Sequence, residues 1–181
     1  MEARVRAKRP LPIVVRRAPG RPKEARVQLA HGVRRAALGR GGLKVLKREG
    51  DGATPIGSLP VRGVLYRADR LARPRTALPL RAIGPRDGWC DDPSDRNYNR
   101  LVRLPYGRSA ETMMRGDALY DLVLVLGYND RTRVRGRGSA IFAHLARPGY
   151  TPTDGCIAFS REDMAAVLAQ VRKGSAFLVI P

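Results

Sequence analysis

The stretch GSAIFAHLARPGYTPTDGCIAFS, residues 138–160, places one histidine and one cysteine around a turn-rich loop. His144 lies near the end of one apolar run, and Cys156 follows Gly155 and opens another. A cysteine nucleophile needs a base for its thiol proton and backbone donors for an oxyanion. A glycine before the cysteine lets a substrate approach the backbone closely. Since the chain holds only two histidines and two cysteines, the pattern favours a thiol enzyme; the alternative is a buried cysteine beside an unrelated histidine.

A helix and a strand are predicted directly after this stretch. Ser160 fits a helix N-cap, with Asp163 three residues later as in a capping box. The next apolar side chains recur at helical spacing: Met164, Val167, Leu168 and Val171. Lys173 and Gly174 are typical of a helix end, and residues 176–180 have the composition of a last strand.

Strand patterns dominate the rest of the chain. Runs that predict strands occupy residues 13–15, 26–30, 33–38, 61–67, 119–128, 138–145 and 156–159. The second and third flank His31 and Gly32 as in a hairpin, which puts His31 at the surface. Residues 119–128, LYDLVLVLGY, are nearly continuously apolar and predict the central buried strand. With 19 Gly and 14 Pro among 181 residues, we expect one mainly β domain with a single helix.

Residues 68–118 predict a long irregular insertion. A connection of this length is usually functional or disordered, and aromatic side chains beside acidic ones favour order here. Trp89, the only tryptophan, precedes Cys90 and the acidic pair Asp91 and Asp92. We interpret the segment as an insertion packed over a cleft; the alternative is an aromatic anchor for a long loop. Cys90 is expected to be a packed small hydrophobic residue rather than a second nucleophile.

Positive charge is concentrated near the N-terminus of this strongly basic chain. The net charge is +19, and residues 1–48 carry fifteen Lys and Arg side chains against Glu2 and Glu24. We therefore predict a basic, flexible arm over residues 1–25 and a folded catalytic domain over residues 26–181. Such an arm can contact an anionic envelope polymer or nucleic acid through counterion release. The alternative is a poorly ordered tail that reflects an Arg-rich composition.

The sequence shows no convincing membrane span or secretory signal. It has no run of about 18 apolar residues, the length that suggests a transmembrane helix. The apolar part near the N-terminus, residues 11–15, is shorter than the roughly 7–15 residues of a signal-peptide core. The two cysteines lie in neither a CxxC nor a disulfide-dense setting, so they do not indicate a redox compartment.

Four segments, in their order along the chain, resemble the L,D-transpeptidase catalytic domain, also called the YkuD domain. The signature of that family is a histidine, a loop and Ser/Thr-His-Gly-Cys, followed by an apolar and then a polar or basic residue. His144 and the Thr-Asp-Gly-Cys of residues 153–156 are similar to it. The other segments are residues 49–57, which resemble a K-x-G-D-x-x-T-P-x-G motif, residues 127–129 and residues 138–142. The resemblance covers about residues 26–180 and implies a YkuD-like β-sandwich with one capped helix.

The resemblance also implies acyl transfer through a cysteine thioester, without a cofactor. Cys156 would attack the carbonyl of a peptidoglycan stem peptide, while His144 takes the thiol proton and then protonates the leaving amine. The amine of an acceptor stem peptide, typically that of diaminopimelate, would then attack the thioester. The backbone around Gly155 and Cys156 would supply the oxyanion donors, and a backbone carbonyl near the motif would orient the imidazole.

Three features depart from the family pattern. Asp154 replaces the histidine before Gly-Cys, Ala158 replaces the basic residue two positions after the cysteine, and the spacing from histidine to cysteine is short. These changes concern donor recognition rather than the nucleophile and base. Arg147 or Arg137 is a candidate for the missing cation, so Arg147 and Asp154 are candidate substrate-binding residues. A different stem-peptide bond is the alternative, including a linkage between positions one and three rather than three and three.

Further substrate-binding candidates follow from their expected positions. Tyr128 and Asn129, at the end of the central strand, are predicted to lie near the strand that carries the base. Trp89, Asp91 and Asp92 are predicted to close over the donor or to bind the ammonium group of diaminopimelate. Loop packing explains each of these residues equally well.

The pattern offers no support for metal or nucleotide chemistry. The histidines and cysteines are too scattered for ligand spacing, and no phosphate-binding glycine loop is present. The leading hypothesis is an L,D-transpeptidase that cross-links peptidoglycan stem peptides in the periplasm or cell envelope. One alternative is an L,D-carboxypeptidase or amidase, in which water replaces the amine. The other is a non-catalytic protein that binds nucleic acid or an envelope polymer through its basic arm.

Overall fold

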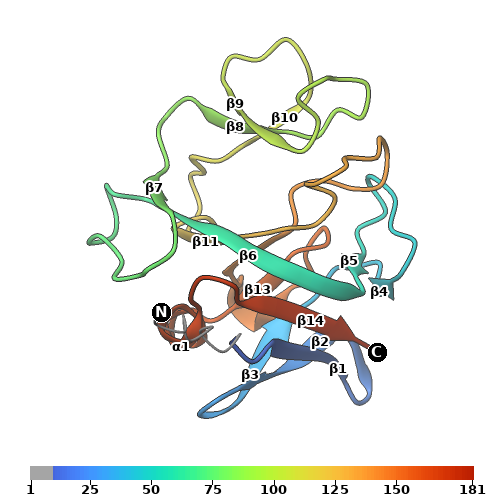
Figure 1. Ribbon diagram of the computed structural model, residues 1–181, viewed down its shortest axis with the longest axis vertical. Coiled ribbons are helices and arrows are strands. Elements are labelled where there is room, and N and C mark those ends of the chain that lie inside the picture. The colour runs from blue at the N-terminus through green and yellow to red at the C-terminus, as the bar shows by residue number, and fades with distance from the viewer. Residues whose placement is uncertain (1–9) are drawn as a thin grey trace, which may run out of the picture.

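The computed structural model describes residues 10–181, in which β-strands dominate and a single α-helix follows the cysteine, as predicted (Figure 1). The elements are β1 (Ile13–Ala18), β2 (Arg21–Leu29), β3 (Gly32–Ala37), β4 (Leu43–Lys44), β5 (Thr54–Pro55), β6 (Gly57–Tyr66), β7 (Leu80–Ala82), β8 (Asp87–Cys90), β9 (Arg100–Arg103), β10 (Ala110–Thr112), β11 (Leu122–Leu126), β12 (Phe142–Leu145), the 3-10 turn η1 (Pro148–Tyr150), β13 (Ile157–Phe159), α1 (Arg161–Gln170) and β14 (Ala176–Ile180). The hairpin around His31 is confirmed as β2 and β3.

Nine strands form one sheet that closes on itself. The strand order is β11-β12-β13-β3-β2-β1-β14-β6-β7, and β6 also pairs with β11. This closure is possible because β6 is long: its first residues pair with β14 and its later residues with β11. The curved sheet wraps around one apolar core, in agreement with the predicted sandwich-like architecture.

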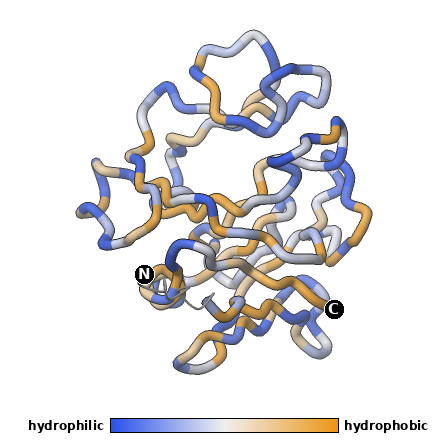
Figure 2. Tube along the Cα trace, viewed as in Figure 1, coloured by the Kyte–Doolittle hydropathy of each residue, from blue (hydrophilic) through white to orange (hydrophobic). Residues whose placement is uncertain are grey.

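The side chains of β12 and β13 alternate between two faces, as the pleat of a β-strand requires. Those of the inner face enter the main core: Ala143 and Leu145 of β12, and Ile157 and Phe159 of β13. Those of the outer face point to the other side: Phe142, His144, Cys156 and Ala158. Figure 2 shows that hydrophobic residues are frequent along the central strands and hydrophilic residues are frequent in the peripheral loops.

The helix α1 follows the outer-face cysteine after one short strand. The Ser160 hydroxyl accepts a hydrogen bond from the Asp163 N–H at 3.0 Å, which confirms the predicted N-cap. The Asp163 carboxylate pairs with Arg34 of β3 at 3.2 Å rather than completing a capping box. Met164 and Val167 are buried against the main core, so the helix fixes the end of β13 to the sheet.

The insertion over residues 68–118 is more regular than predicted. β8, β9 and β10 form a separate three-stranded sheet, and β7 pairs with β6 at the margin of the main sheet. Figure 1 shows this small sheet standing apart from the main one. Strands of three or four residues have too little periodicity to be recognised in a sequence. The insertion contacts the outer face through Trp89, whose ring packs edge-on against Phe142 with 5.0 Å between centroids.

The segment before His144 also differs from the prediction. The strand β12 begins at Phe142 rather than at residue 138, because Gly138 and Ala140 have φ angles of 102° and 51°. Such left-handed conformations interrupt a strand. The predicted central strand is confirmed as β11, which has β12 and β6 as neighbours.

Part of the predicted basic arm belongs to the sheet. Residues 13–25 lie in β1 and the first part of β2, and β1 pairs with both β2 and β14. Ile13 and Val15 are buried in the core, which explains why this segment folds with the domain. Residues 1–9 lie outside the described residues, so a flexible arm stays a prediction for them.

Candidate active site

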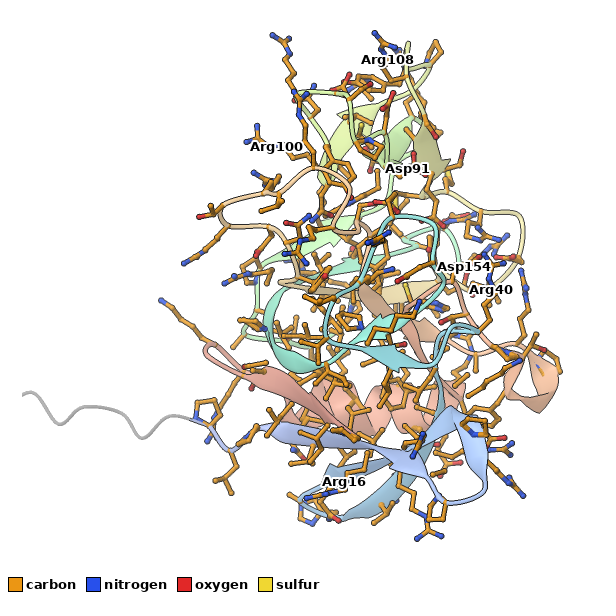
Figure 3. The ribbon with its side chains drawn as sticks, turned by 90° about the vertical axis from the view of Figure 1, so that its right-hand side faces the viewer. Arg16, Arg40, Asp91, Arg100, Arg108 and Asp154 are labelled. Carbon is orange, nitrogen blue, oxygen red and sulfur yellow. The ribbon has the colours of Figure 1, made fainter. Side chains whose placement is uncertain are left out.

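A cleft of about 510 Å³ lies against the outer face of β12 and β13. Its lining includes His144 of β12, Cys156 directly before β13, Asp91 from the insertion, and Arg40 and Asp154 from loops of the main domain. Figure 3 shows Asp91 above Arg40 and Asp154, with the insertion on one side of the site and the main sheet on the other. The predicted nucleophile and base therefore share one cleft.

Cys156 is buried at the floor of this cleft. Its Sγ donates to the Ala140 carbonyl at 3.2 Å and lies 3.3 Å from the Phe142 amide nitrogen, whose N–H it accepts. Burial raises the pKa of the Cys156 thiol to about 12, and the nearby Glu111 carboxylate adds to the shift. The thiol is therefore protonated at neutral pH.

His144 is held in one tautomer by the backbone. Its Nδ1 lies 2.8 Å from the Leu145 carbonyl oxygen. Because a carbonyl oxygen can only accept, we assign the ring proton to Nδ1, which leaves Nε2 as a hydrogen-bond acceptor. The Tyr120 ring packs against the imidazole with 5.3 Å between centroids. Burial lowers the pKa of His144 to about 4, so the imidazole is neutral at neutral pH.

The two reactive groups are neighbours that do not yet hydrogen-bond. The parallel register of β12 and β13 pairs His144 with Ala158, two residues after Cys156. The thiol proton of Cys156 points to Ala140 instead. Proton transfer to the imidazole therefore requires the thiol to turn away from this carbonyl.

The loop before the cysteine is shaped by Thr153 and Gly155. The Thr153 hydroxyl donates to the Cys156 carbonyl at 2.6 Å and accepts the Gly155 N–H at 3.2 Å. Gly155 has a φ of +128°, and a Cβ added there would lie 2.7 Å from the Ala53 carbonyl oxygen. Both facts require glycine at this position. They also mean that the Gly155 N–H is already used.

Asn99 fixes the backbone at Ala140, the residue whose carbonyl accepts the thiol proton. The side-chain oxygen of Asn99 accepts the Ala140 N–H at 3.1 Å and the Trp89 Nε1–H at 2.9 Å. Its amide nitrogen donates to the carbonyls of Tyr128 and Asn129, both at 2.9 Å. This buried side chain thus connects the insertion, the end of β11 and the segment that leads to Phe142.

A second group of contacts fixes the same segment from the loop before β5. The Tyr98 hydroxyl donates to Glu49 and accepts the Gly138 N–H at 2.9 Å. The Ser139 hydroxyl donates to Glu49 at 2.8 Å. The Oε2 atom of Glu49 therefore helps to position residues 138–140.

The segment that resembles the K-x-G-D-x-x-T-P-x-G motif has a structural role around a buried ion pair. Lys47 is 2% exposed and pairs with Asp51 at 2.8 Å. Asp51 also accepts the backbone N–H groups of Arg48 and Ala53. These hydrogen bonds hold the pKa of Asp51 well below its usual range, against the effect of burial. These contacts hold together the loop that bounds the cleft.

Three side chains of the cleft were not predicted from the sequence. The Tyr120 hydroxyl donates to the Glu111 carboxylate at 2.7 Å, and the Arg115 guanidinium lies over the Tyr120 ring, 5.2 Å from its centroid. Burial raises the pKa of Glu111. The only sequence signal was a carboxylate close to the apolar pair at residues 113–114, which is weak without the fold.

The predicted substrate-binding residues fall into two groups. Arg147, Asp154 and Asp91 line the cleft, and Asp154 pairs with Arg40 at 3.1 Å. In the described part of the chain, the other four do not line it: Trp89, Asp92, Tyr128 and Asn129. They make packing or loop contacts instead, and their role in substrate binding stays a prediction.

The contacts of this second group are local. Asp92 accepts the N–H and hydroxyl of Ser94. The Tyr128 hydroxyl donates to the Arg137 carbonyl at 2.8 Å, and Asn129 donates to the carbonyls of Val134 and Gly138. These bonds shape the turn after β11 rather than the cleft.

Neither Cys90 nor a cluster of metal ligands provides a second reactive site among the described residues. Cys90 is fully buried, as expected, and burial raises the pKa of its thiol. Among residues 10–181, no three His, Cys, Asp or Glu side chains are grouped so that they could hold a metal ion. Within the same residues, no helix has the length and apolar character needed to cross a membrane.

Comparison with protein families assigns most of the chain to one family. Residues 22–180 match the model of the YkuD family, described as the L,D-transpeptidase catalytic domain. The chain belongs to this family. Members of the YkuD family are cysteine-dependent L,D-transpeptidases that act on peptidoglycan peptides, generally in the cell envelope. A search of curated proteins found no match. The family match includes His144, Cys156 and the insertion.

Proposed function

We propose that this YkuD-family protein is a cysteine-dependent L,D-transpeptidase that cross-links peptidoglycan stem peptides through a thioester at Cys156. The observation that carries the proposal is the placement of Cys156 and His144 on one face of adjacent strands, inside a cleft. The Leu145 carbonyl supports the role of His144 as base, because it leaves Nε2 free of a proton.

The first half-reaction forms the thioester. The Cys156 sulfur bonds to the donor carbonyl carbon while its proton passes to Nε2 of His144. The peptide C–N bond then breaks, and the imidazolium returns the proton to the leaving amine. A pKa of about 12 for the thiol and about 4 for the imidazole disfavours a resting ion pair. Proton transfer therefore accompanies the attack on the carbonyl rather than preceding it.

The second half-reaction transfers the acyl group. The amine of the acceptor stem peptide attacks the thioester carbon, the C–S bond breaks, and the thiol is regenerated. We assign oxyanion stabilisation to the Cys156 N–H, because the Gly155 N–H already donates to Thr153. Water in place of the amine would give the carboxypeptidase reaction.

The donor bond is the less determined part of the proposal. Ala158 and Asp154 line the cleft where the family pattern has a basic residue and a histidine. Arg147 also lines the cleft and would supply the cation that orients the donor. We therefore extend the proposal to a linkage between stem-peptide positions one and three, formed in the periplasm or cell envelope.

Incubation of purified muropeptides with matched cysteine variants tests the proposal. Wild-type protein and Cys90→Ser should form cross-linked dimers and a mass adduct on Cys156, whereas Cys156→Ser should form neither. Fragmentation of the dimers by mass spectrometry identifies the linkage. Absence of both adduct and dimers with folded wild-type protein would refute a transpeptidase, and shortened monomers alone would indicate the carboxypeptidase.

A further inference from the structure

The cleft is acidic although the chain as a whole is strongly basic. Its charged lining residues are four acidic ones, Glu49, Asp91, Glu111 and Asp154, and three basic ones, Arg40, Arg115 and Arg147. The net charge of the chain is +19. A cleft with an excess of carboxylates in such a protein favours a cationic group over an anionic one.

Three of these carboxylates, Glu49, Asp91 and Glu111, have no strong cationic partner among the described residues. Asp154 pairs with Arg40, and Glu49 is engaged by hydroxyl groups. In contrast, Oδ1 of Asp91 is buried and has no hydrogen-bond partner among the described residues. A buried carboxylate oxygen without a partner is costly and rare in folded proteins. Because Asp91 also lines the cleft, a donor bound in the cleft would satisfy this oxygen.

Glu111 is only partly neutralised. Its hydrogen bond comes from the neutral Tyr120 hydroxyl, while Arg115 stands 3.6 Å away. The Arg115 guanidinium is already held by both oxygens of Asp117, each at 2.8 Å. The Glu111 carboxylate thus retains the capacity to bind another cation in the cleft.

The two carboxylates project from the same face of the insertion. The antiparallel register of β8 and β10 places Glu111 opposite Trp89, and Asp91 lies two residues after Trp89. Directly opposed residues share a face, and alternate residues along a strand do so as well. Asp91 and Glu111 are therefore diagonal neighbours on the side that faces the main sheet. Of the charges that act on Cys156, Glu111 has the largest effect.

We propose that Glu111, together with Asp91, binds the amine that attacks the thioester, in its ammonium form, and holds it over Cys156. This inference rests on the function proposed above. A lone carboxylate beside the thiol opposes thiolate formation and so gives the first half-reaction no benefit. Once a primary ammonium lies between Asp91 and Glu111, these carboxylates attract it and place it at the acyl group of the thioester.

The proton balance of the transfer follows from this placement. The ammonium first gives one proton to the Glu111 carboxylate, and the free amine attacks the thioester carbon. The second amine proton passes to His144 Nε2, the C–S bond breaks, and the imidazolium protonates the leaving thiolate. Glu111 then releases its proton to water. The raised pKa of Glu111 supports a proton-accepting role; its surroundings include Tyr120, Arg115, Asp91 and Asp154.

Competition between a charged and an uncharged nucleophile tests the inference. Wild-type protein with a stem-tetrapeptide donor would receive either meso-diaminopimelate, whose amines are ammonium groups near neutral pH, or hydroxylamine, which is mostly uncharged there. The measured quantity is the ratio of kcat/KM for the two nucleophiles. Since hydrogen bonds to charged groups are strong, Glu111→Gln should lower this ratio at least about tenfold. Asp91→Asn should lower it in the same direction by a smaller factor.

The matched control is Glu162→Gln, which removes one exposed carboxylate from α1 and should keep the wild-type ratio. An unchanged ratio in Glu111→Gln, or an equal fall in Glu162→Gln, would overturn the inference. Both results leave the proposed function standing as long as the wild type forms the thioester and transfers it. If the wild type forms no thioester, the proposed function fails and this inference fails with it. Should Glu111→Gln not fold, an unchanged ratio in Asp91→Asn overturns the inference.

Discussion

The two faces of β12 and β13 are equally buried but serve different ends. On the inner face Leu145 is 5% exposed and Phe159 is fully buried; on the outer face His144 is 5% and Cys156 7% exposed. The inner side chains meet the apolar core, whereas the outer ones meet a cleft under the insertion. Burial stabilises the fold on the inner face. On the outer face, burial shifts the pKa values of His144 and Cys156 in the directions that keep both side chains uncharged.

The largest effect is expected when His144, the proposed base on the outer face, is replaced. His144→Gln keeps a side chain of similar size but provides no proton acceptor of comparable strength. Thioester formation should slow about 10²- to 10⁴-fold, the usual contribution of a general base. Single-turnover mass spectrometry of the Cys156 adduct measures this rate, and circular dichroism checks the fold. A rate near that of the wild type would assign the base elsewhere.

The pH dependence of the wild type sharpens this assignment. Burial lowers the pKa of His144 to about 4, so the imidazole is unprotonated and competent above this pH. The rate of thioester formation should fall as the pH drops through about 4, where the ring becomes protonated and can no longer accept a proton. If the rate of thioester formation instead fell near the usual histidine pKa of about 6.5, the imidazole would be solvated. It would then differ from the buried inner-face residues.

The next largest effect concerns alkylation of the outer-face thiol without substrate. Because the pKa of Cys156 is about 12, the thiolate fraction should rise about tenfold per pH unit across the neutral and mildly alkaline range. The iodoacetamide reaction rate should follow it, measured in a Cys90→Ser background so that only one thiol reports. A plateau near pH 6 to 7 would instead reveal a preformed thiolate–imidazolium pair.

Local patterns in the sequence are sufficient to predict the elements that carry the proposed nucleophile and base. Ser160 is recognisable as an N-cap because it is a hydroxyl residue three positions before Asp163, and its hydroxyl accepts the N–H of that residue. His144 and Cys156 were identified because both lie in one short stretch with strands on each side. Such features depend on neighbours along the chain, and a sequence displays those directly.

The opposite wall of the cleft could not be predicted in the same way. Glu111 reaches the site only because β10 pairs with β8, a strand some twenty residues earlier, and because the small sheet packs over the outer face. Ala140 breaks the predicted strand through a left-handed φ that Asn99 supports from a distance in sequence. Contacts of this kind follow from tertiary packing, and neither hydrophobic period nor turn composition indicates them.

A smaller effect is expected from the inner face, on stability rather than chemistry. Phe159 is fully buried and packs against Phe177, with 6.4 Å between ring centroids. Phe159→Ala should lower the free energy of unfolding by about 3–5 kcal/mol, measured by urea denaturation. The folded fraction should still form the Cys156 adduct. A loss of reactivity without a loss of stability would contradict the separation of the two faces.

The smallest effect is expected at the helix that joins the two faces. The Ser160 hydroxyl caps α1 at its N-terminus, and the helix packs Met164 against the inner-face core. Ser160→Ala should lower the free energy of unfolding by about 1 kcal/mol, with the midpoint of urea denaturation shifted at constant slope. Ser109→Ala removes an exposed hydroxyl and should change stability by less than about 0.5 kcal/mol. If the free energy of unfolding fell by the same amount in Ser160→Ala and Ser109→Ala, the N-cap would make no specific contribution to stability. A fall in thioester formation in folded Ser160→Ala would show that the helix also positions Cys156, which would connect the faces more closely than their separate contacts imply.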